Sequence, residues 1–254
     1  MLKYFFMQTP GNWFQEWFNS PYYHKLYLDR DDKEAAEFIE RLINYLQPPQ
    51  NSLMIDIGCG RGRHAKILAS KEFDVTGIDI APDNIEYALA SENDHLHFYQ
   101  HDMRMPFWIN YFDYAFNFFT SFGYFKTERE HNNAIRSISQ SLKHNGIFVL
   151  DYLNVQFADN HLVNESIKQI EGTTFHLTKW FDENNFYKKI IIEDEGLPNN
   201  LEFTEKVARF TLTDFEKMFA DQGFKILEVF GDYQLNKYDE KKSPRLLMVA
   251  KKEM

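Results

Sequence analysis

A short segment around residue 57 has the residue types and spacing of a cofactor-binding turn. Residues 52–63 read S-L-M-I-D-I-G-C-G-R-G-R, an apolar run that contains Asp56 and ends in glycines at 58, 60 and 62. Glycines let a backbone approach a ligand closely, and the N-terminus of the helix that follows favours an anionic group. A second apolar run ends at Asp79, where a carboxylate can accept both hydroxyls of a ribose. This order predicts a nucleotide-type cofactor site.

The glycine spacing separates two kinds of cofactor. A G-x-G-x-x-G motif starting at Gly58 would need its third glycine where Arg63 stands, so a dinucleotide dehydrogenase fits poorly. G-x-G-x-G with Asp56 two residues before the first glycine resembles motif I of the class I S-adenosylmethionine (SAM) methyltransferases. The resemblance covers about Asp31 to Lys251. The alternative is an ordinary strand–turn–helix whose glycines serve packing.

This resemblance implies SAM as the cofactor and S-adenosylhomocysteine as the product. The methionine carboxylate would lie at the helix N-terminus, and Asp56 would face the methionine ammonium or brace the turn. Asp102 follows the third predicted strand, where in this family an acid hydrogen-bonds the adenine amino group. The implied cofactor-binding residues are Asp56, Gly58, Cys59, Gly60, Asp79, Ile80, Asp102, Met103, Asn117 and Phe118.

The end of the fourth predicted strand bears on the methyl acceptor. Residues 117–125 read N-F-F-T-S-F-G-Y-F. Small-molecule methyltransferases, such as the sugar N-methyltransferases and the relatives of glycine N-methyltransferase, carry a small-polar and aromatic stretch here. DNA amine methyltransferases carry [Asp/Asn]-Pro-Pro-[Tyr/Phe] instead. We expect Tyr124 to orient the acceptor, followed as catalytic candidates by Asp151 and Asn154 at the end of the fifth strand. A packed loop aromatic is the alternative for Tyr124.

Strands and helices alternate through most of the chain. Strands are expected at 53–57, 74–80, 96–101, 111–119, 147–152, 225–230 and 245–250, and helices at 31–46, 63–71, 82–91, 128–142 and 213–222. Capping boxes are expected at Asp31-x-x-Glu34 and Thr213-x-x-Glu216, and Asn145-Gly146 is expected to end the helix over 128–142 before the next strand. The prediction is an α/β, Rossmann-like class I methyltransferase fold: a mostly parallel seven-stranded sheet with helices on both faces.

The pattern changes after Asn154. Residues 175–181, 186–193 and 201–210 read as three antiparallel strands inserted after strand five, as in the small-molecule enzymes. We therefore expect a SAM-binding domain over 31–154 and 211–254, with residues 155–210 as a substrate cap. Residues 1–30 are rich in aromatics and form an expected lid, in which Tyr22, Tyr27 and Arg30 reach toward the methionine end or the acceptor. Packing in a core is the alternative for this segment.

Composition excludes several other classes of protein. The net charge of −10 argues against a nucleic-acid partner. The single cysteine, Cys59, excludes an internal disulfide and a cysteine zinc cluster, and it fits a tight turn better than a nucleophile. No histidine spacing predicts a metal site: His95-x-His97 merely shares one strand face. No apolar run approaches the ~20 residues of a membrane span, so we expect a cytoplasmic protein without a membrane partner.

Other functions stay open from the sequence. They are a protein or nucleic-acid methyltransferase, a degenerate SAM-binding module that serves as a partner-binding domain, and a Rossmann oxidoreductase. Asp56, Asp79 and the intact glycines count against the degenerate module, and Arg63 counts against the oxidoreductase. The expected partner is a small-molecule methyl acceptor, and a homodimer is compatible with the sequence.

Overall fold

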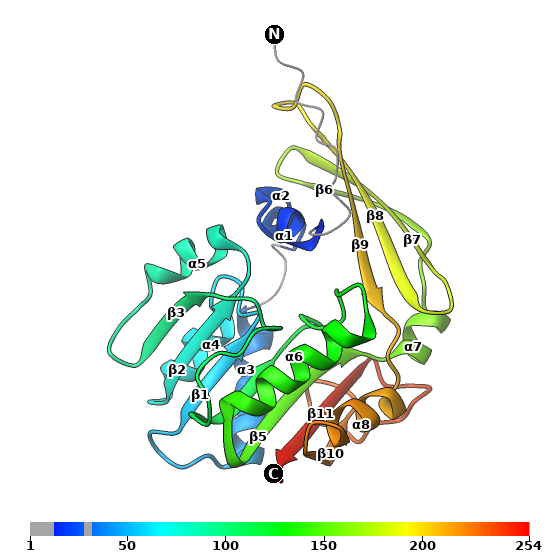
Figure 1. Cartoon of the computed structure of the whole chain (residues 1–254). Coiled ribbons are helices and arrows are strands. Elements are labelled where there is room, and N and C mark those ends of the chain that lie inside the picture. Colours follow the sequence, from blue (N-terminus) through cyan, green and yellow to red (C-terminus); the bar gives the residue numbers. More distant parts are fainter. Residues whose placement is uncertain (1–12, 28–31, 254) are drawn as a thin grey trace. The chain divides into compact units, whose positions relative to one another are not determined.

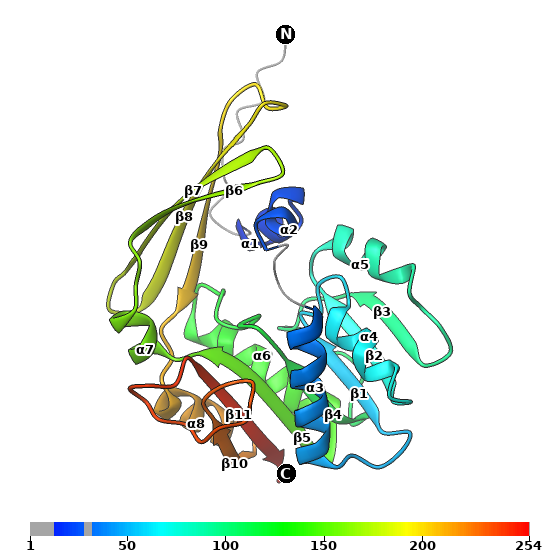
Figure 2. The same ribbon diagram turned by 180° about the vertical axis from the view of Figure 1, so that it is seen from behind.

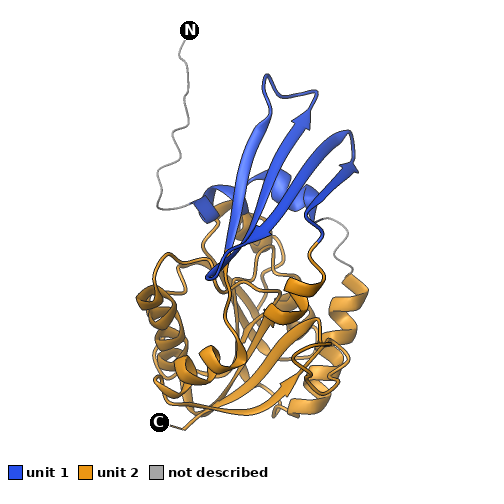
Figure 3. Cartoon of the chain, turned by 90° about the vertical axis from the view of Figure 1, so that its right-hand side faces the viewer, with its two compact units in different colours: residues 1–29, 163–206 blue, residues 30–162, 207–254 orange. Residues whose placement is uncertain are grey.

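The computed structural model describes residues 13–27 and 32–253. Arg30 and the first predicted cap residue, Asp31, lie outside the described residues. The chain divides into two compact units, coloured separately in Figure 3. Unit 1 combines residues 1–29 with 163–206, and unit 2 combines residues 30–162 with 207–254. Each unit therefore draws on two separate stretches of the sequence.

Unit 2 is built on a seven-stranded sheet in the order β10-β11-β5-β4-β1-β2-β3. Only β11 runs antiparallel to its neighbours, so the predicted, mostly parallel sheet is confirmed. β5 begins at Leu142 rather than Ile147, and the predicted break at Asn145 is a left-handed residue (φ 65°) within it. The strands are β1 (Leu53–Ile57), β2 (Asp74–Asp79), β3 (Leu96–Gln100), β4 (Phe112–Asn117), β5 (Leu142–Leu153), β10 (Phe224–Phe230) and β11 (Arg245–Lys252).

Helices cover both faces of this sheet, as predicted. α6 and α8 lie on the face seen in Figure 1, whereas α3 and α4 lie on the face seen in Figure 2. Four apolar residues of α3, Ala35, Phe38, Ile39 and Leu42, are buried in the core of unit 2, where Phe38 packs on Phe118 and Tyr233. The helices are α3 (Asp32–Leu46), α4 (Arg63–Ala69), α5 (Pro82–Leu89), α6 (Glu128–Ser141), α7 (Val155–Asn160) and α8 (Leu212–Ala220).

One predicted cap was wrong. The cap of α8 is Thr211, whose hydroxyl accepts the backbone N–H of Asp214 while the Asp214 carboxylate accepts the N–H of Thr211. The prediction placed the same pattern two residues later, at Thr213 and Glu216. Because Leu212 already adopts helical geometry, the first turn begins before the predicted cap.

Unit 1 is a four-stranded antiparallel sheet in the order β6-β7-β8-β9, with α1 (Trp13–Phe18) and α2 (Pro21–Leu26). The strands are β6 (Glu165–Ile170), β7 (Thr173–Phe181), β8 (Asn185–Asp194) and β9 (Leu201–Ala208). The prediction of three strands missed β6. That strand is short and largely exposed, so it lacks the apolar alternation that marks a half-buried strand.

The N-terminal aromatic residues supply the core of unit 1. Trp17 and Leu26 are buried against residues of β7 and β8, namely Phe175, Leu177, Ile190 and Ile192. The indole N–H of Trp17 donates to the Glu205 carboxylate at 2.7 Å. Within this unit the aromatic segment therefore packs as core. No helix in the described part of the chain is long and apolar enough to cross a membrane.

Candidate cofactor site

The glycine turn lies between β1 and α4 and contacts the loop after β4. Gly58 has φ +71°, and a Cβ placed there would lie 2.7 Å from Cβ of Ser121. The Ser121 hydroxyl donates to the Gly58 carbonyl at 3.3 Å. Only glycine fits a position that is both left-handed and this tightly packed.

Asp56 is buried beneath this turn. Burial, reinforced by the nearby Asp79 carboxylate, raises the pKa of Asp56 to about 7, while the Ala65 backbone N–H and Arg63 oppose the shift. Its Oδ2 has no hydrogen-bond partner among the residues that the structure describes. A buried carboxylate oxygen without a donor is costly, so this atom is suited to receive a ligand's cationic donor.

Asp79 links the glycine turn to the start of α5. Its Oδ2 accepts the Gly60 N–H and its Oδ1 accepts the Ala81 N–H, both at 2.8 Å. The Asn84 amide also donates to Oδ1, at 3.4 Å. Burial raises the pKa of Asp79, although these hydrogen bonds oppose the shift. The two acids that the sequence singled out, Asp56 and Asp79, thus lie close enough to influence each other.

Cys59 occupies the turn between these acids. It is buried, and its thiol donates to the Gly60 carbonyl with 3.5 Å between Sγ and O. Burial, together with the Asp79 and Asp56 carboxylates, raises the pKa of the Cys59 thiol. A thiol held protonated in this way is a poor nucleophile, which agrees with a small residue chosen for a tight turn.

Asn117 braces the turn from the end of β4. Its side-chain amide donates to the Ile57 carbonyl at 2.8 Å, and its Oδ1 is buried without a hydrogen-bond partner in the described ranges. Phe118 beside it points into the core and packs on Phe38 and His64. Asn117 therefore leaves a polar atom available, whereas the Phe118 ring belongs to the core.

The loop after β4 turns through two left-handed residues. Phe119 has φ +55° and Thr120 has φ +58°, although neither is glycine. Such conformations cost about 1–3 kcal/mol each and persist where surrounding contacts enforce them. The Phe119 ring stacks on His64, with centroids 5.1 Å apart, and lies under the Arg63 guanidinium.

Asp151, a predicted catalytic candidate, is completely buried and engaged on both oxygens. Oδ2 accepts the Phe119 N–H at 2.8 Å and the Tyr233 hydroxyl at 3.0 Å. Oδ1 accepts Nε of Arg245 at 2.8 Å. Burial alone would lower the pKa of Arg245, but the charge and hydrogen bond of Asp151, together with Tyr233 and Tyr124, outweigh it and the pKa is raised. Asp151 is therefore the buried ion-pair partner of Arg245.

Asn154, the second strand-end candidate, is engaged elsewhere. Its amide donates to the carbonyls of Glu240 and Ser243, at 2.8 and 2.7 Å. Its Oδ1 accepts the Gln156 N–H at the start of α7 and the Tyr238 hydroxyl. The side chain thus caps a helix and ties down the loop before β11.

Tyr124 is half-buried in the loop after β4, and its phenol is near enough to Arg245 to contribute to the raised pKa of the guanidinium. Gly123 before it has φ +100° and sits against the hydroxyl of Tyr152, which in turn donates to the Ala208 carbonyl at 2.6 Å. The backbone that carries Tyr124 is therefore fixed by buried contacts.

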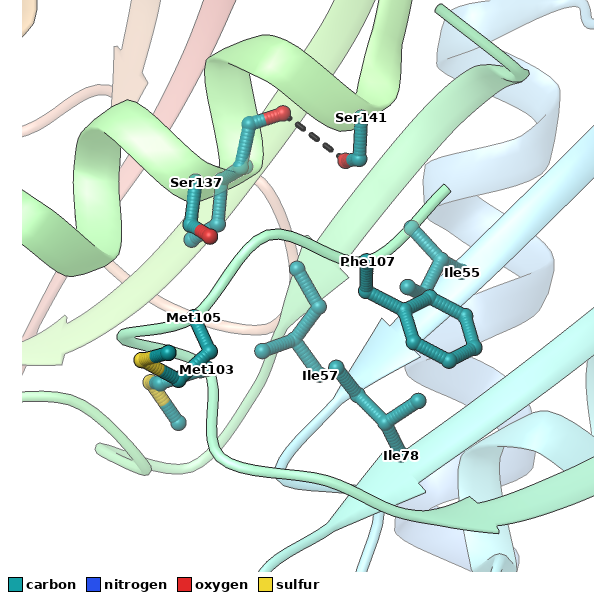
Figure 4. Close-up of a pocket in the computed structure, with 9 residues that line it drawn as sticks. Ile55, Ile57, Ile78, Met103, Met105, Phe107, Ser137 and Ser141 are labelled. Carbon is teal, nitrogen blue, oxygen red and sulfur yellow. Dashed lines mark hydrogen bonds between the residues drawn. The ribbon is translucent and has the colours of Figure 1, made fainter. Parts of the chain in front are cut away.

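Asp102 and Met103 lie in the loop that follows β3. Both Asp102 oxygens accept hydrogen bonds from Arg104, which also pairs with Glu130 at 2.5 Å. Burial would raise the pKa of Asp102, but Arg104 outweighs it and the pKa is lowered. Figure 4 shows Met103, Met105 and neighbouring side chains around a small apolar pocket between the sheet and α6. Arg104 therefore keeps Asp102 ionised, and the apolar side chains of Met103 and Met105 anchor the loop that carries it.

Tyr27, predicted to reach the cofactor, lies in unit 1. Its hydroxyl donates to Glu205 at 2.8 Å and accepts from Nζ of Lys188 at 2.6 Å. Arg30, predicted with it, lies outside the described residues. In residues 13–27 and 32–253, no group of three or more His, Cys, Asp or Glu side chains could hold a metal ion.

Comparison with known families identifies the kind of protein in which this glycine turn occurs. The model of a family described as a methyltransferase domain matches residues 27–229, most of the chain. The chain belongs to this methyltransferase family. It is a SAM-dependent enzyme, and its cofactor is S-adenosylmethionine.

Relatives of this methyltransferase include enzymes of sugar chemistry. The dTDP-3-amino-3,4,6-trideoxy-alpha-D-glucopyranose N,N-dimethyltransferase of Streptomyces venezuelae is 24% identical over 212 residues, 80% of this chain and 89% of that protein. A SAM-dependent methyltransferase from Clostridium acetobutylicum superposes with a TM-score of 0.76 at 17% identity, over 91% and 95% of the two chains. SAM-bound CalS10, an amino pentose methyltransferase from Micromonospora echinaspora, gives 0.64 at 22% identity, over 92% and 97%. At these identities the structural likeness establishes the fold.

Several residues of the methyltransferase site were not anticipated from the sequence. Ser121 lies in the loop after β4 and donates to Gly58, Arg245 contacts the same loop at Thr120, and Asn84 contacts Asp79. Ser121 is part of the strand-end motif over residues 117–125, so its small polar side chain was a usable signal. Arg245 lies 94 residues from Asp151, and only the pairing of β11 with β5 brings them together.

Proposed function

We propose that this methyltransferase moves the methyl group of SAM to a nitrogen or oxygen atom of a small molecule. The observation that carries the cofactor half of the proposal is a pair of buried, unpartnered acceptor atoms in the described structure, Oδ2 of Asp56 and Oδ1 of Asn117, at the ends of the two strands next to the glycine turn. A Cβ placed on Gly60 would meet no atom within 4 Å, so the backbone at Gly60 faces open space. These features fit a polar ligand with a cationic donor.

In the proposed site each side chain has a distinct role. Asp56 and the helix N-terminus behind Gly58, Cys59 and Gly60 hold the amino-acid end of the cofactor. Asp79 accepts from the ribose hydroxyls. The ribose and adenine are further held by Ile80, Asp102 and Met103. Asn117 offers its Oδ1 next to the turn, and Phe118 acts indirectly as part of the core beside it.

The chemistry asks little more of the protein. When bound, SAM supplies a methyl group already activated on a sulfonium, with a neutral thioether as the leaving group. The protein's task is then to align the acceptor and exclude water. Tyr124 orients the acceptor's N–H or O–H through its phenol, and Asp151 and Asn154 act indirectly through the contacts described above.

Three observations support a small acceptor. The strand-four motif, Asn117-Phe118-Phe119-Thr120, lacks the two prolines of the nucleobase-amine enzymes, and the net charge of −10 disfavours a polyanionic substrate. Among the relatives, the Streptomyces venezuelae enzyme acts on an amino sugar. We further propose that residues 155–210, most of which belong to unit 1, shape the acceptor site, with residues 1–30 as their cover.

A screen for S-adenosylhomocysteine release tests this proposal. The purified enzyme is incubated with SAM and with separate sets of acceptors: nucleotide-linked amino sugars, free amines, hydroxylated metabolites, a protein extract, and RNA and DNA. We expect turnover in one of the small-molecule sets. Turnover confined to protein or nucleic acid would contradict the small-acceptor proposal, and SAM binding without turnover in any set would favour a non-catalytic module.

A further inference from the structure

We infer that Asp151 and Arg245 form a positioning pair that holds Phe119 and Thr120 in their left-handed conformation. Through these two residues the pair supports the glycine turn, at which SAM is proposed to bind, before the cofactor arrives. The inference rests on the proposed function and assigns Asp151 and Arg245 a role without direct contact to cofactor or acceptor. All of the groups concerned lie in unit 2.

The conformation to be held is an unfavourable one. Phe119 and Thr120 have φ values of +55° and +58°, and two consecutive non-glycine residues rarely adopt this region because Cβ crowds the following carbonyl. Without outside contacts the loop would relax to another conformation. Some part of the surrounding structure must therefore supply the constraint.

Asp151 and Arg245 supply contacts at both residues. The Asp151 carboxylate accepts the Phe119 N–H, and the Asp151 backbone carbonyl accepts the Thr120 N–H at 3.0 Å. Nη2 of Arg245 donates to the Thr120 hydroxyl at 2.9 Å and pairs with the Asp151 carboxylate at 2.7 Å. Tyr233 adds its hydroxyl to the same carboxylate. The buried pair thus holds both backbone N–H groups and one side chain of the turn.

The held turn contacts the glycine turn directly. Phe119 stacks on His64 and lies under Arg63, the first two residues of α4. The next residue, Ser121, donates to the carbonyl of Gly58. Because Gly58 has no room for even a Cβ against Ser121, a shift of the loop after β4 would displace one wall of the glycine turn.

The arrangement explains why a fully buried carboxylate is paired here with a largely buried guanidinium. A buried pair adds little stability compared with apolar residues of the same volume, and its best-supported use is to specify one conformation. A binding site formed in advance loses less free energy to ordering when its ligand arrives. We therefore expect that loss of the pair lowers the affinity for the cofactor more than it lowers the free energy of unfolding.

The test measures S-adenosylhomocysteine binding by calorimetry for the wild type, Asp151→Asn, Arg245→Lys, and the double variant Asp151→Asn/Thr120→Gly. Asp151→Asn keeps the size of the side chain but leaves Arg245 without its counter-charge, and should weaken binding by about 10-fold or more. Arg245→Lys keeps the charge and loses the two-point geometry, so a smaller loss of affinity is expected. Glycine adopts positive φ freely, so Thr120→Gly should recover at least about 3-fold of the affinity lost in Asp151→Asn.

Lys143→Met is the matched control. Lys143 of β5 pairs with Asp113 of β4 at 2.9 Å, at the end of β5 opposite to Asp151. The affinity of the Lys143→Met variant for S-adenosylhomocysteine should stay within about 2-fold of that of the wild type. Unchanged affinity in Asp151→Asn would overturn the inference. So would a loss that Thr120→Gly fails to recover, because the pair would then act only as a general stabiliser.

Hydrogen exchange of residues 117–122 separates this inference from the proposed function. If the wild type binds neither SAM nor S-adenosylhomocysteine, the proposed function fails by itself. Faster exchange at Phe119 and Thr120 in Asp151→Asn, but not in Lys143→Met, would still support the positioning pair. Equal exchange in the two variants would overturn it. If Asp151→Asn does not fold, Arg245→Lys gives the same comparison.

Discussion

The backbone N–H of Gly60 donates to the Asp79 carboxylate across 2.8 Å, joining the glycine turn to the end of β2. The same carboxylate accepts the N–H of Ala81 through its other oxygen. Asp79 therefore shapes the protein around the site before any ligand binds. Its lone pairs that are not used in this way remain for ribose hydroxyls.

Replacing Asp79 with alanine should weaken SAM binding by roughly 2–4 kcal/mol, or about 30-fold or more in Kd. Both the proposed ribose contacts and the support of Gly60 are lost in this variant. Calorimetry with SAM measures the change. Asp74→Asn, at the other end of β2, is the control and should bind normally. A folded Asp79→Ala variant with wild-type affinity would show that Asp79 serves only the turn.

The raised pKa of Asp56 should make stability depend on pH. In an unfolded chain an aspartate titrates near 3.9, whereas burial raises the pKa of Asp56 to about 7 in the fold. Between these values the folded state holds the extra proton, so the free energy of unfolding falls as pH rises. The contribution of Asp56 is fully present below about pH 4 and is lost above about pH 7.

Asp56→Asn should remove this dependence. From pH 5 to pH 8, the wild type should lose about 2 kcal/mol of unfolding free energy relative to the variant, measured by urea denaturation. Asp74→Asn should follow the wild type. In addition, a cationic ammonium next to Asp56 should expel its proton, so SAM binding at pH 6 should release a proton in the wild type and not in Asp56→Asn. Calorimetry in two buffers of different ionisation enthalpy counts that proton.

Tyr124→Phe should lower turnover by about 10- to 100-fold while leaving SAM affinity unchanged, because only the contact that orients the acceptor is removed. The assay is S-adenosylhomocysteine release with the acceptor found in the screen. Tyr111→Phe, an exposed position, is the control. Normal turnover of Tyr124→Phe would assign its ring to packing.

Trp17→Ala should destabilise unit 1. The indole is fully buried and donates to Glu205, so its removal should cost about 3–5 kcal/mol in the stability of that unit. Hydrogen exchange of residues 188–192 in β8 should accelerate accordingly. Trp180→Ala removes an indole that is 40% exposed and stacked on Tyr187, and should have a much smaller effect. Equal effects of the two substitutions would contradict the assigned core.

Local signals in the sequence predicted the sheet domain well. The glycine turn, Asp56 and Asp79 depend on residues near one another along the chain, and the structure brings them together at 2.8 Å from Gly60 to Asp79. The roles of Asp151 and Asn154 could not be predicted in the same way. Their partners, Arg245 and Ser243, are about 90 residues away, and an antiparallel last strand had to be placed beside β5 before the contacts could be seen.

The discontinuous composition of unit 1 has a consequence for synthesis on the ribosome. Trp17 and Leu26 are translated early, but the strands that bury them, β7 and β8, end at Phe181 and Asp194. Until β8 has left the exit tunnel, the two helices carry uncovered apolar side chains, whereas β1 to β5 of unit 2 are already available for folding. A nascent chain stalled shortly before β9 should therefore be the species most in need of a chaperone.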